Sequence, residues 1–157
     1  MVLLALLAIL LGSYAILSVA DRAWAKGRLP AELRGRVSLS LLFLFTGMGH
    51  FVRSEPMAQM LPDWMPARFA FIYITGVLEW AGAVGLLTRG LARPAGVCLI
   101  AFLVLALPAN VYAAVHRVQM GGHQAGPAYL LLRVPFQLLL IWWTYRFAVR
   151  RRTLPGA

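Results

Sequence analysis

The sequence has a single cysteine, Cys98, in 157 residues. One cysteine cannot form an intrachain disulfide, a Cys-x-x-Cys redox pair or a cysteine-rich metal site. Thiol–disulfide relay chemistry within one chain is therefore excluded.

Charged residues are also scarce, and acidic residues are the scarcest. The chain is 13% charged and 61% hydrophobic, with 5 Asp+Glu against 15 Lys+Arg and a formal net charge of +10. Soluble domains are about 25% charged and about 45–50% apolar. Together with a mean hydropathy of +0.76, this composition excludes a soluble enzyme, a disordered tail and a secreted disulfide scaffold. It predicts one membrane domain.

The common cofactor motifs are missing too. There is no phosphate loop and no glycine fingerprint for a dinucleotide, and no nucleophile elbow or His-Glu-x-x-His motif. His116 and His123 share a loop with Met120, but their spacing suits no compact metal pair. The sequence thus indicates no metal site and no evident cofactor, and whether the chain is an enzyme stays open.

Five apolar runs dominate the chain. The first, Val2 to Ala20, is uncharged and long enough to cross the roughly 30 Å hydrocarbon core as a helix. No Lys or Arg precedes it, so we interpret it as a retained helix and not as a signal peptide. The other four runs cover residues 31–52, 67–87, 95–115 and 128–148.

Short connections between these runs favour antiparallel neighbours in one bundle. The predicted fold class is all-α: a polytopic transmembrane helical bundle with a four-helix core and one additional N-terminal transmembrane helix. The predicted organisation is an N-terminal helix and cytoplasmic loop at 1–30, the four-helix membrane bundle at 31–149 with an interfacial segment at 53–66, and a basic cytoplasmic tail at 150–157.

The basic residues predict the orientation. If the N-terminus lies outside, eleven of the 15 Lys and Arg residues fall on the cytoplasmic side, three fall outside and Arg133 lies within a span. This is the bias of the positive-inside rule. We therefore expect a multi-pass protein of the cell (inner) membrane, with the N-terminus outside and the C-terminus cytoplasmic. The excess charge then reflects orientation and contact with anionic membrane lipid, not nucleic acid.

Polar residues inside the spans are the candidate functional residues, because each is costly at membrane depth. Three of them are ionisable and two are amides; they are His50, Glu79, Asn110, Arg133 and Gln137. Chain direction places them in the outer half of the bundle, where convergence on one buried polar cluster or ligand site costs least. The expected ion pair is Glu79 with Arg133, directly or through Gln137, Asn110 or water. Such a pair can form a site, or it can simply fix helix register.

Two further features bear on packing. Pro108 and Pro135 should each free the carbonyl four residues earlier, and such carbonyls must be satisfied inside the protein or in a wet cavity. Ala81-xxx-Gly85 is a small-xxx-small pair that favours close packing within the bundle, or a dimer seam.

Five short motifs occur in order between Leu42 and Phe147. They are Phe45-x-Gly47-x-x-His50-Phe51, Pro62-x-Trp64-x-Pro66, Thr75-Gly76-x-x-Glu79, Pro108-Ala109-Asn110 and Arg133-x-Pro135-x-Gln137. With these five motifs in this order, the chain resembles the DoxX-like family of small integral membrane proteins. The resemblance implies a core of four helices, with Val2–Ala20 as an extension. Some DoxX-like relatives are subunits associated with quinone-linked sulfur oxidation or oxidative-stress complexes, and distant eukaryotic relatives resemble assembly chaperones for channel subunits.

The expected function is therefore that of an accessory or assembly partner of a membrane complex, whose partners are other membrane proteins or a second copy. The alternative is a site for a quinone, a lipid or another apolar small molecule in the outer half of the bundle. A transporter is less favoured, because the five helices show no internal repeat.

Overall fold

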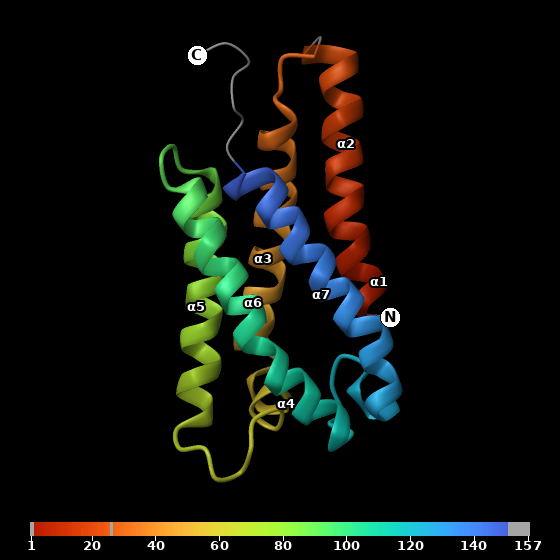
Figure 1. Cartoon of the computed structure of the whole chain (residues 1–157), viewed down its shortest axis with the longest axis vertical. Coiled ribbons are helices and arrows are strands. Elements are labelled where there is room, and N and C mark those ends of the chain that lie inside the picture. The colour runs from red at the N-terminus through yellow and green to blue at the C-terminus, as the bar shows by residue number, and fades with distance from the viewer. Residues whose placement is uncertain (1, 26, 151–157) are drawn as a thin grey trace.

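The computed structural model describes residues 2–25 and 27–150, and these residues form a bundle of antiparallel helices (Figure 1). The first helical segment runs from Val2 to Ala25, five residues beyond the predicted end. It consists of α1 (Val2–Leu7), the π-helical turn η1 (Ala8–Gly12), α2 (Ser13–Ala20) and the π-helical turn η2 (Asp21–Ala25). We call this segment the N-terminal arm.

Asp21 explains why the arm extends past its apolar run. Its side chain is buried, accepts a hydrogen bond from the Leu29 backbone N–H at 2.9 Å and pairs with Arg34 at 3.4 Å. The carboxylate thus ties the end of the arm to the connection that follows it and to the helix beyond.

Helix α3 spans Ala31–Val52, as predicted, and begins directly after Pro30. A short helix, α4 (Ser54–Ala58), lies within the expected interfacial segment and leads to α5 (Arg68–Leu87). Helix α6 covers Ala92–Val115 and starts three residues before the predicted boundary.

The last span is less regular than predicted. It begins as the 3-10 segment η3 (His123–Tyr129), continues as α7 (Leu130–Thr144) and ends as the π-helical turn η4 (Tyr145–Val149). Gly126, with φ of 76°, interrupts η3 before α7 begins. The tail predicted at 150–157 lies outside the described residues beyond Arg150.

The predicted fold class is confirmed: the described residues are helical without strands, and five helical segments are long and apolar enough to cross a membrane. Only 11–39% of the most apolar window of each segment is buried inside the bundle. Large apolar side chains therefore cover the outer surface, as a bilayer solvent requires.

Figure 1 shows two distinct ends. One end carries α4 and the loop between α6 and η3. The opposite end carries the connections from the arm to α3 and from α5 to α6, together with the end of η4. The core between the two ends is apolar, and its fully buried side chains include Leu10 of the arm as well as Leu39, Leu42 and Phe43 of α3 and Leu86 of α5.

Glycines allow the helices to approach one another inside this core. A Cβ at Gly76 would lie 2.7 Å from the His50 Cβ, and a Cβ at Gly47 would lie 2.5 Å from the Trp80 ring, so α3 and α5 meet at these two positions. Gly85 packs in the same way against Ala95 of α6. Of the two alternatives for the small residues of α5, the structure shows close packing within the bundle.

Candidate functional site

The five predicted polar residues lie in two groups. The first group joins α3 to α5 around Glu79, whose side chain is only 6% exposed. The Thr46 hydroxyl donates to Glu79 Oε2 at 2.5 Å, and His50 Nε2 lies 3.4 Å from Glu79 Oε1. We call Thr46, His50, Thr75 and Glu79 the Glu79 network.

The other edge of the His50 ring determines where its hydrogen resides. Nδ1 lies 3.0 Å from the Ile72 carbonyl oxygen and 3.0 Å from Thr75 Oγ1. A carbonyl only accepts, and the Thr75 hydroxyl is directed to the carbonyls of Phe71 and Ile72, so Nδ1 carries a hydrogen. Nε2, on the opposite side of the ring, faces Glu79 Oε1 at 3.4 Å.

The second group joins α6 to α7. Arg133 Nε donates to Asn110 Oδ1 at 3.0 Å, and Asn110 Nδ2 donates to the Ala106 carbonyl at 2.8 Å. One turn further along α7, Gln137 Nε2 donates to the Leu103 carbonyl at 2.5 Å. These bonds fix the two helices in register at membrane depth.

The expected direct ion pair between Glu79 and Arg133 is wrong. Among the described residues, the ionic partner of Glu79 is His50, and the hydrogen-bond partner of Arg133 is Asn110. The physical reason is that α3 packs closely on α5 and satisfies both carboxylate oxygens, while Asn110 on α6 lies nearer the guanidinium. The charges of Glu79 and Arg133 still interact at longer range.

Gln137 forms its hydrogen bond next to the carbonyl that Pro108 was expected to free. Pro108 cannot donate to Val104, and the side chain from α7 reaches the carbonyl of Leu103, one residue earlier. A side chain of the neighbouring helix thus bonds to the carbonyl next to the one that Pro108 frees.

His123 is the polar residue that the sequence interpretation missed. The sequence placed it in a loop with His116 and Met120, and in the structure its side chain is only 4% exposed and lies edge-on to the Tyr129 ring, 4.8 Å between centroids. Gly121, Gly122 and Gly126, all with positive φ, turn the loop back toward the bundle. This glycine spacing was the available signal.

Several polar atoms of the second group and of His123 have no hydrogen-bond partner among the described residues. His123 Nε2 and Gln137 Oε1 are buried without a hydrogen bond. The two terminal amino groups of Arg133 have no acceptor among the residues that the structure describes, since its one hydrogen bond uses Nε. Unlike the Glu79 network, this part of the site therefore contains donors and acceptors that no described residue satisfies.

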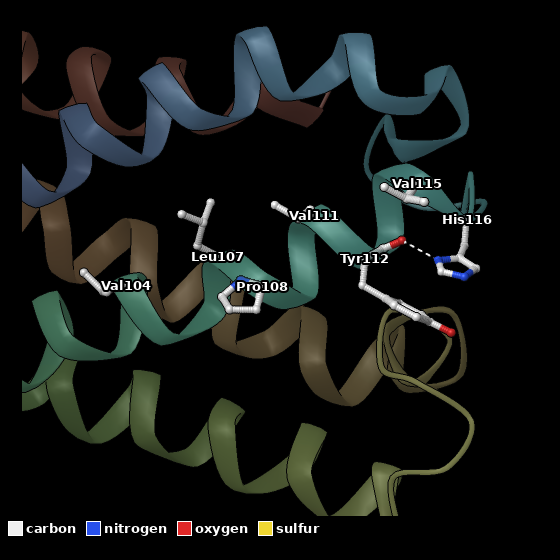
Figure 2. Close-up of a pocket in the computed structure, with 7 residues that line it drawn as sticks. All are labelled: Val104, Leu107, Pro108, Val111, Tyr112, Val115 and His116. Atoms are coloured by element: carbon white, nitrogen blue, oxygen red, sulfur yellow. Dashed lines mark hydrogen bonds between the residues drawn. The ribbon is translucent and has the colours of Figure 1, made fainter.

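A shallow groove of about 560 Å³ runs along α6, apart from the Glu79 network (Figure 2). Its lining is almost wholly apolar, with Tyr112 and His116 at one end; the other lining residues are Val104, Leu107, Pro108, Val111 and Val115. None of the five predicted polar residues lines it, although Asn110 immediately precedes Val111 in the chain. Within residues 2–25 and 27–150, no three His, Cys, Asp or Glu side chains gather closely enough to hold a metal ion.

The family model that matches this chain covers residues 39–148, which is more than half of the sequence. The chain belongs to DUF8561, a domain of unknown function. The DUF8561 region contains both polar groups and His123, whereas the N-terminal arm lies outside it. No curated protein matches the chain, and no solved structure does.

Proposed function

We propose that this DUF8561 protein is an accessory or assembly subunit of a membrane complex, as its resemblance to DoxX-like proteins suggests. The observation that carries the proposal is the closed Glu79 network. A general acid or base must reach its substrate, but both Glu79 oxygens are directed to α3, at Thr46 and His50. The carboxylate serves to hold two helices together, which suits a binding protein better than an acid–base enzyme.

Partner capture is tested by site-specific photo-crosslinking in native membranes. A photoreactive residue at Val84, which faces outward, is compared with one at Leu86, which is fully buried in the same helix. Similar probes on outward positions of the other spans map the surface. A stoichiometric adduct with one membrane protein, or with a second copy, from adjacent outward positions supports the proposal. Adducts with lipid alone at every outward position contradict it.

The orientation belongs to the same proposal. The end of the bundle that carries the arm–α3 and α5–α6 connections also carries most of the basic residues of the sequence. By the positive-inside rule this end is cytoplasmic, with the N-terminus outside and the C-terminus inside the cell (inner) membrane.

Cysteine labelling tests the orientation. Cys98 is first replaced by Ser, and single cysteines are then introduced as Arg89→Cys in the α5–α6 connection and Gln59→Cys after α4, at opposite ends of the bundle. In intact cells a membrane-impermeant maleimide should label only the Gln59→Cys protein. Labelling of the Arg89→Cys protein instead would reverse the orientation.

A second candidate function is binding of a membrane-soluble small molecule such as a quinone or a lipid. One observation favours it: the terminal amino groups of Arg133 lack a protein acceptor, and Asn110, its partner, adjoins a groove residue. Native mass spectrometry of the purified protein would report a retained molecule. Complete absence of any adduct after gentle extraction would contradict this function.

A further inference from the structure

Arg133 is a cation in a membrane span with no anion beside it. Glu79 pairs with His50; among the described residues, the only hydrogen bond of Arg133 is made by Nε to the neutral Asn110, and its Cζ lies 5.9 Å from the centroid of the Phe136 ring. Both terminal amino groups remain without an acceptor in the part of the chain that the structure describes. A guanidinium is a planar fork that fits phosphate or carboxylate oxygens in pairs. The missing component is therefore an anion that the protein does not supply.

His123 adds a second unfilled position beside Arg133. Its Nδ1 lies 2.8 Å from the Met120 carbonyl oxygen, so this nitrogen carries the hydrogen of the neutral ring. Nε2 is then a hydrogen-bond acceptor that is buried and unpartnered. Tyr129 lies one helical turn before Arg133, and its ring is 4.8 Å from the His123 ring between centroids, so the three side chains are neighbours.

Tyr129 supplies a donor at the same place. Its hydroxyl makes no hydrogen bond to the described residues, and its ring contacts His123. The Arg133 cluster, which we define as Asn110, His123, Tyr129 and Arg133, thus offers cationic donors, a hydroxyl donor and a neutral acceptor. A matching ligand carries an anionic oxygen together with a hydroxyl group.

The position of the Arg133 cluster suits a lipid headgroup. Arg133 follows the start of α7 by three residues, about 5 Å of helix rise. Side chains on a helix lean toward its N-terminus, which for α7 is the end of the bundle that carries α4 (Figure 1). The guanidinium itself lies over the Phe136 ring, with Cζ 5.9 Å from the ring centroid, and its Nε is bonded to Asn110 of α6.

The α6 groove supplies the apolar part of such a site. It begins at Tyr112 and His116, near the same end of the bundle, and extends inward to Val104. Inward from Asn110, which holds Arg133, the groove continues to Val104, six residues further along α6 or about 9 Å of helix. Figure 2 shows Leu107 and Val111 extending from α6 toward the side of α7, on which Arg133 resides. The inner part of an acyl chain matches this groove in polarity.

We propose that the Arg133 cluster and the α6 groove bind one anionic glycerophospholipid with a hydroxyl-bearing headgroup. The phosphate accepts from the terminal amino groups of Arg133 and from the Tyr129 hydroxyl, a headgroup hydroxyl donates to His123 Nε2, and one acyl chain lies along α6. This proposal rests on the second candidate function and gives it a ligand class. A quinone fits less well, because its carbonyl is neutral and leaves the guanidinium charge uncompensated. A choline lipid also fits less well, because its own cation already compensates the phosphate.

The test uses the full-length protein, delipidated in a neutral detergent and incubated with phosphatidylglycerol, phosphatidylcholine or inorganic phosphate. Native mass spectrometry counts the retained molecules, and a thermal-shift assay reports stabilisation. We expect about tenfold greater retention of phosphatidylglycerol than of phosphatidylcholine, because the interaction is charge-assisted. Inorganic phosphate, which has no acyl chain, should cause no thermal shift at the same concentration.

Two variants separate this site from general attraction to a basic protein. Arg133→Gln keeps a polar side chain but removes the charge and should abolish the preference for phosphatidylglycerol. Tyr129→Phe, which removes only a hydroxyl that bonds to no described residue, should weaken retention several-fold without loss of folding. Arg117→Gln is the matched control, because Arg117 is an exposed basic residue at the same end of the bundle. The Arg117→Gln protein should keep the preference for phosphatidylglycerol over phosphatidylcholine.

Each contrary result has a definite meaning. Equal retention of both phospholipids, an unchanged preference in the folded Arg133→Gln and Tyr129→Phe proteins, or stabilisation by inorganic phosphate alone would overturn the lipid proposal. Retention of a quinone in place of phospholipid would also overturn it, while leaving the second candidate function intact. Retention of no molecule at all would reject both.

Discussion

His50 Nε2 and Glu79 Oε1 lie 3.4 Å apart across the contact between α3 and α5. The bilayer therefore does not have to accommodate an isolated carboxylate near the middle of α5, where Glu79 is the twelfth of 20 residues.

Replacing Glu79 tests the role of this pair in stability. Glu79→Leu removes the acceptor of both Thr46 and His50, and we expect a loss of about 1–3 kcal/mol in the free energy of unfolding, since buried partners are left unsatisfied. Glu79→Gln can still accept from Thr46 and should cost less. Thermal unfolding in detergent measures both variants, with Glu55→Gln at an exposed position as the control.

A double-mutant cycle then isolates the pair. His50→Leu, Glu79→Leu and the combined variant should give a coupling energy of about 0.5–3 kcal/mol, the range for residues in contact. Additive effects would show that the two side chains act independently and would remove the main support for a closed network.

The glycines between α3 and α5 give a second prediction. Gly76→Ala would place a Cβ 2.7 Å from the Cβ of His50, which is not the movable end of a side chain. The helices must separate, so we expect lower thermal stability and a weakened His50–Glu79 pair. Gly12→Ala is the control, because a Cβ there meets nothing within 4 Å and alanine favours a helix by up to about 1 kcal/mol. Equal stabilities of the two variants would contradict the described contact.

The bond from Gln137 to the Leu103 carbonyl can be tested together with Pro108. Gln137→Leu should destabilise the protein by about 0.6–1.7 kcal/mol, the range for hydrogen bonds between membrane helices. If Pro108 creates the need for this donor, Pro108→Ala should reduce the cost of Gln137→Leu in a double-mutant cycle. An unchanged cost would mean that the bond stabilises α6 and α7 without regard to the proline.

The N-terminal arm contributes to the core by packing, and this contribution is measurable. Leu10 is 0% exposed, whereas Leu4 in the same arm is 70% exposed. Leu10→Ala should lower stability, but by less than the about 2–5 kcal/mol of soluble cores, because lipid is as apolar as leucine and only packing is lost. Leu4→Ala should have almost no effect on unfolding in detergent. A similar loss for both variants would show that the arm is not anchored through Leu10.

The sequence predicted the spans more accurately than the contacts between them. Run length and helix-start residues determine an element locally, and α3 therefore matched its predicted bounds of 31 and 52. The partner of Glu79 depends on how α3 rotates against α5, which the glycine contacts set and which no single run contains. The prediction therefore selected the polar residues but joined Glu79 to the wrong helix.

His123 escaped prediction for a related reason. Loops with several glycines are normally exposed, and the burial of this one depends on positive φ values at Gly121, Gly122 and Gly126. The direction in which such a loop folds is decided by the helices that it covers. The candidate ligand-binding part of the site could not be completed from sequence for that reason.

The close packing of α3 against α5 has a consequence for biogenesis. The two helices are antiparallel and are joined by residues 53–67, so they can enter the bilayer together as a helical hairpin. Their glycine contacts and the His50–Glu79 pair lie entirely within that hairpin. Glu79 then enters the hydrocarbon region with its partner, and the energetic barrier to translocating a lone acidic side chain is avoided. The side chains that contact the Glu79 carboxyl group, Thr46 and His50, are thus both present in the hairpin that inserts.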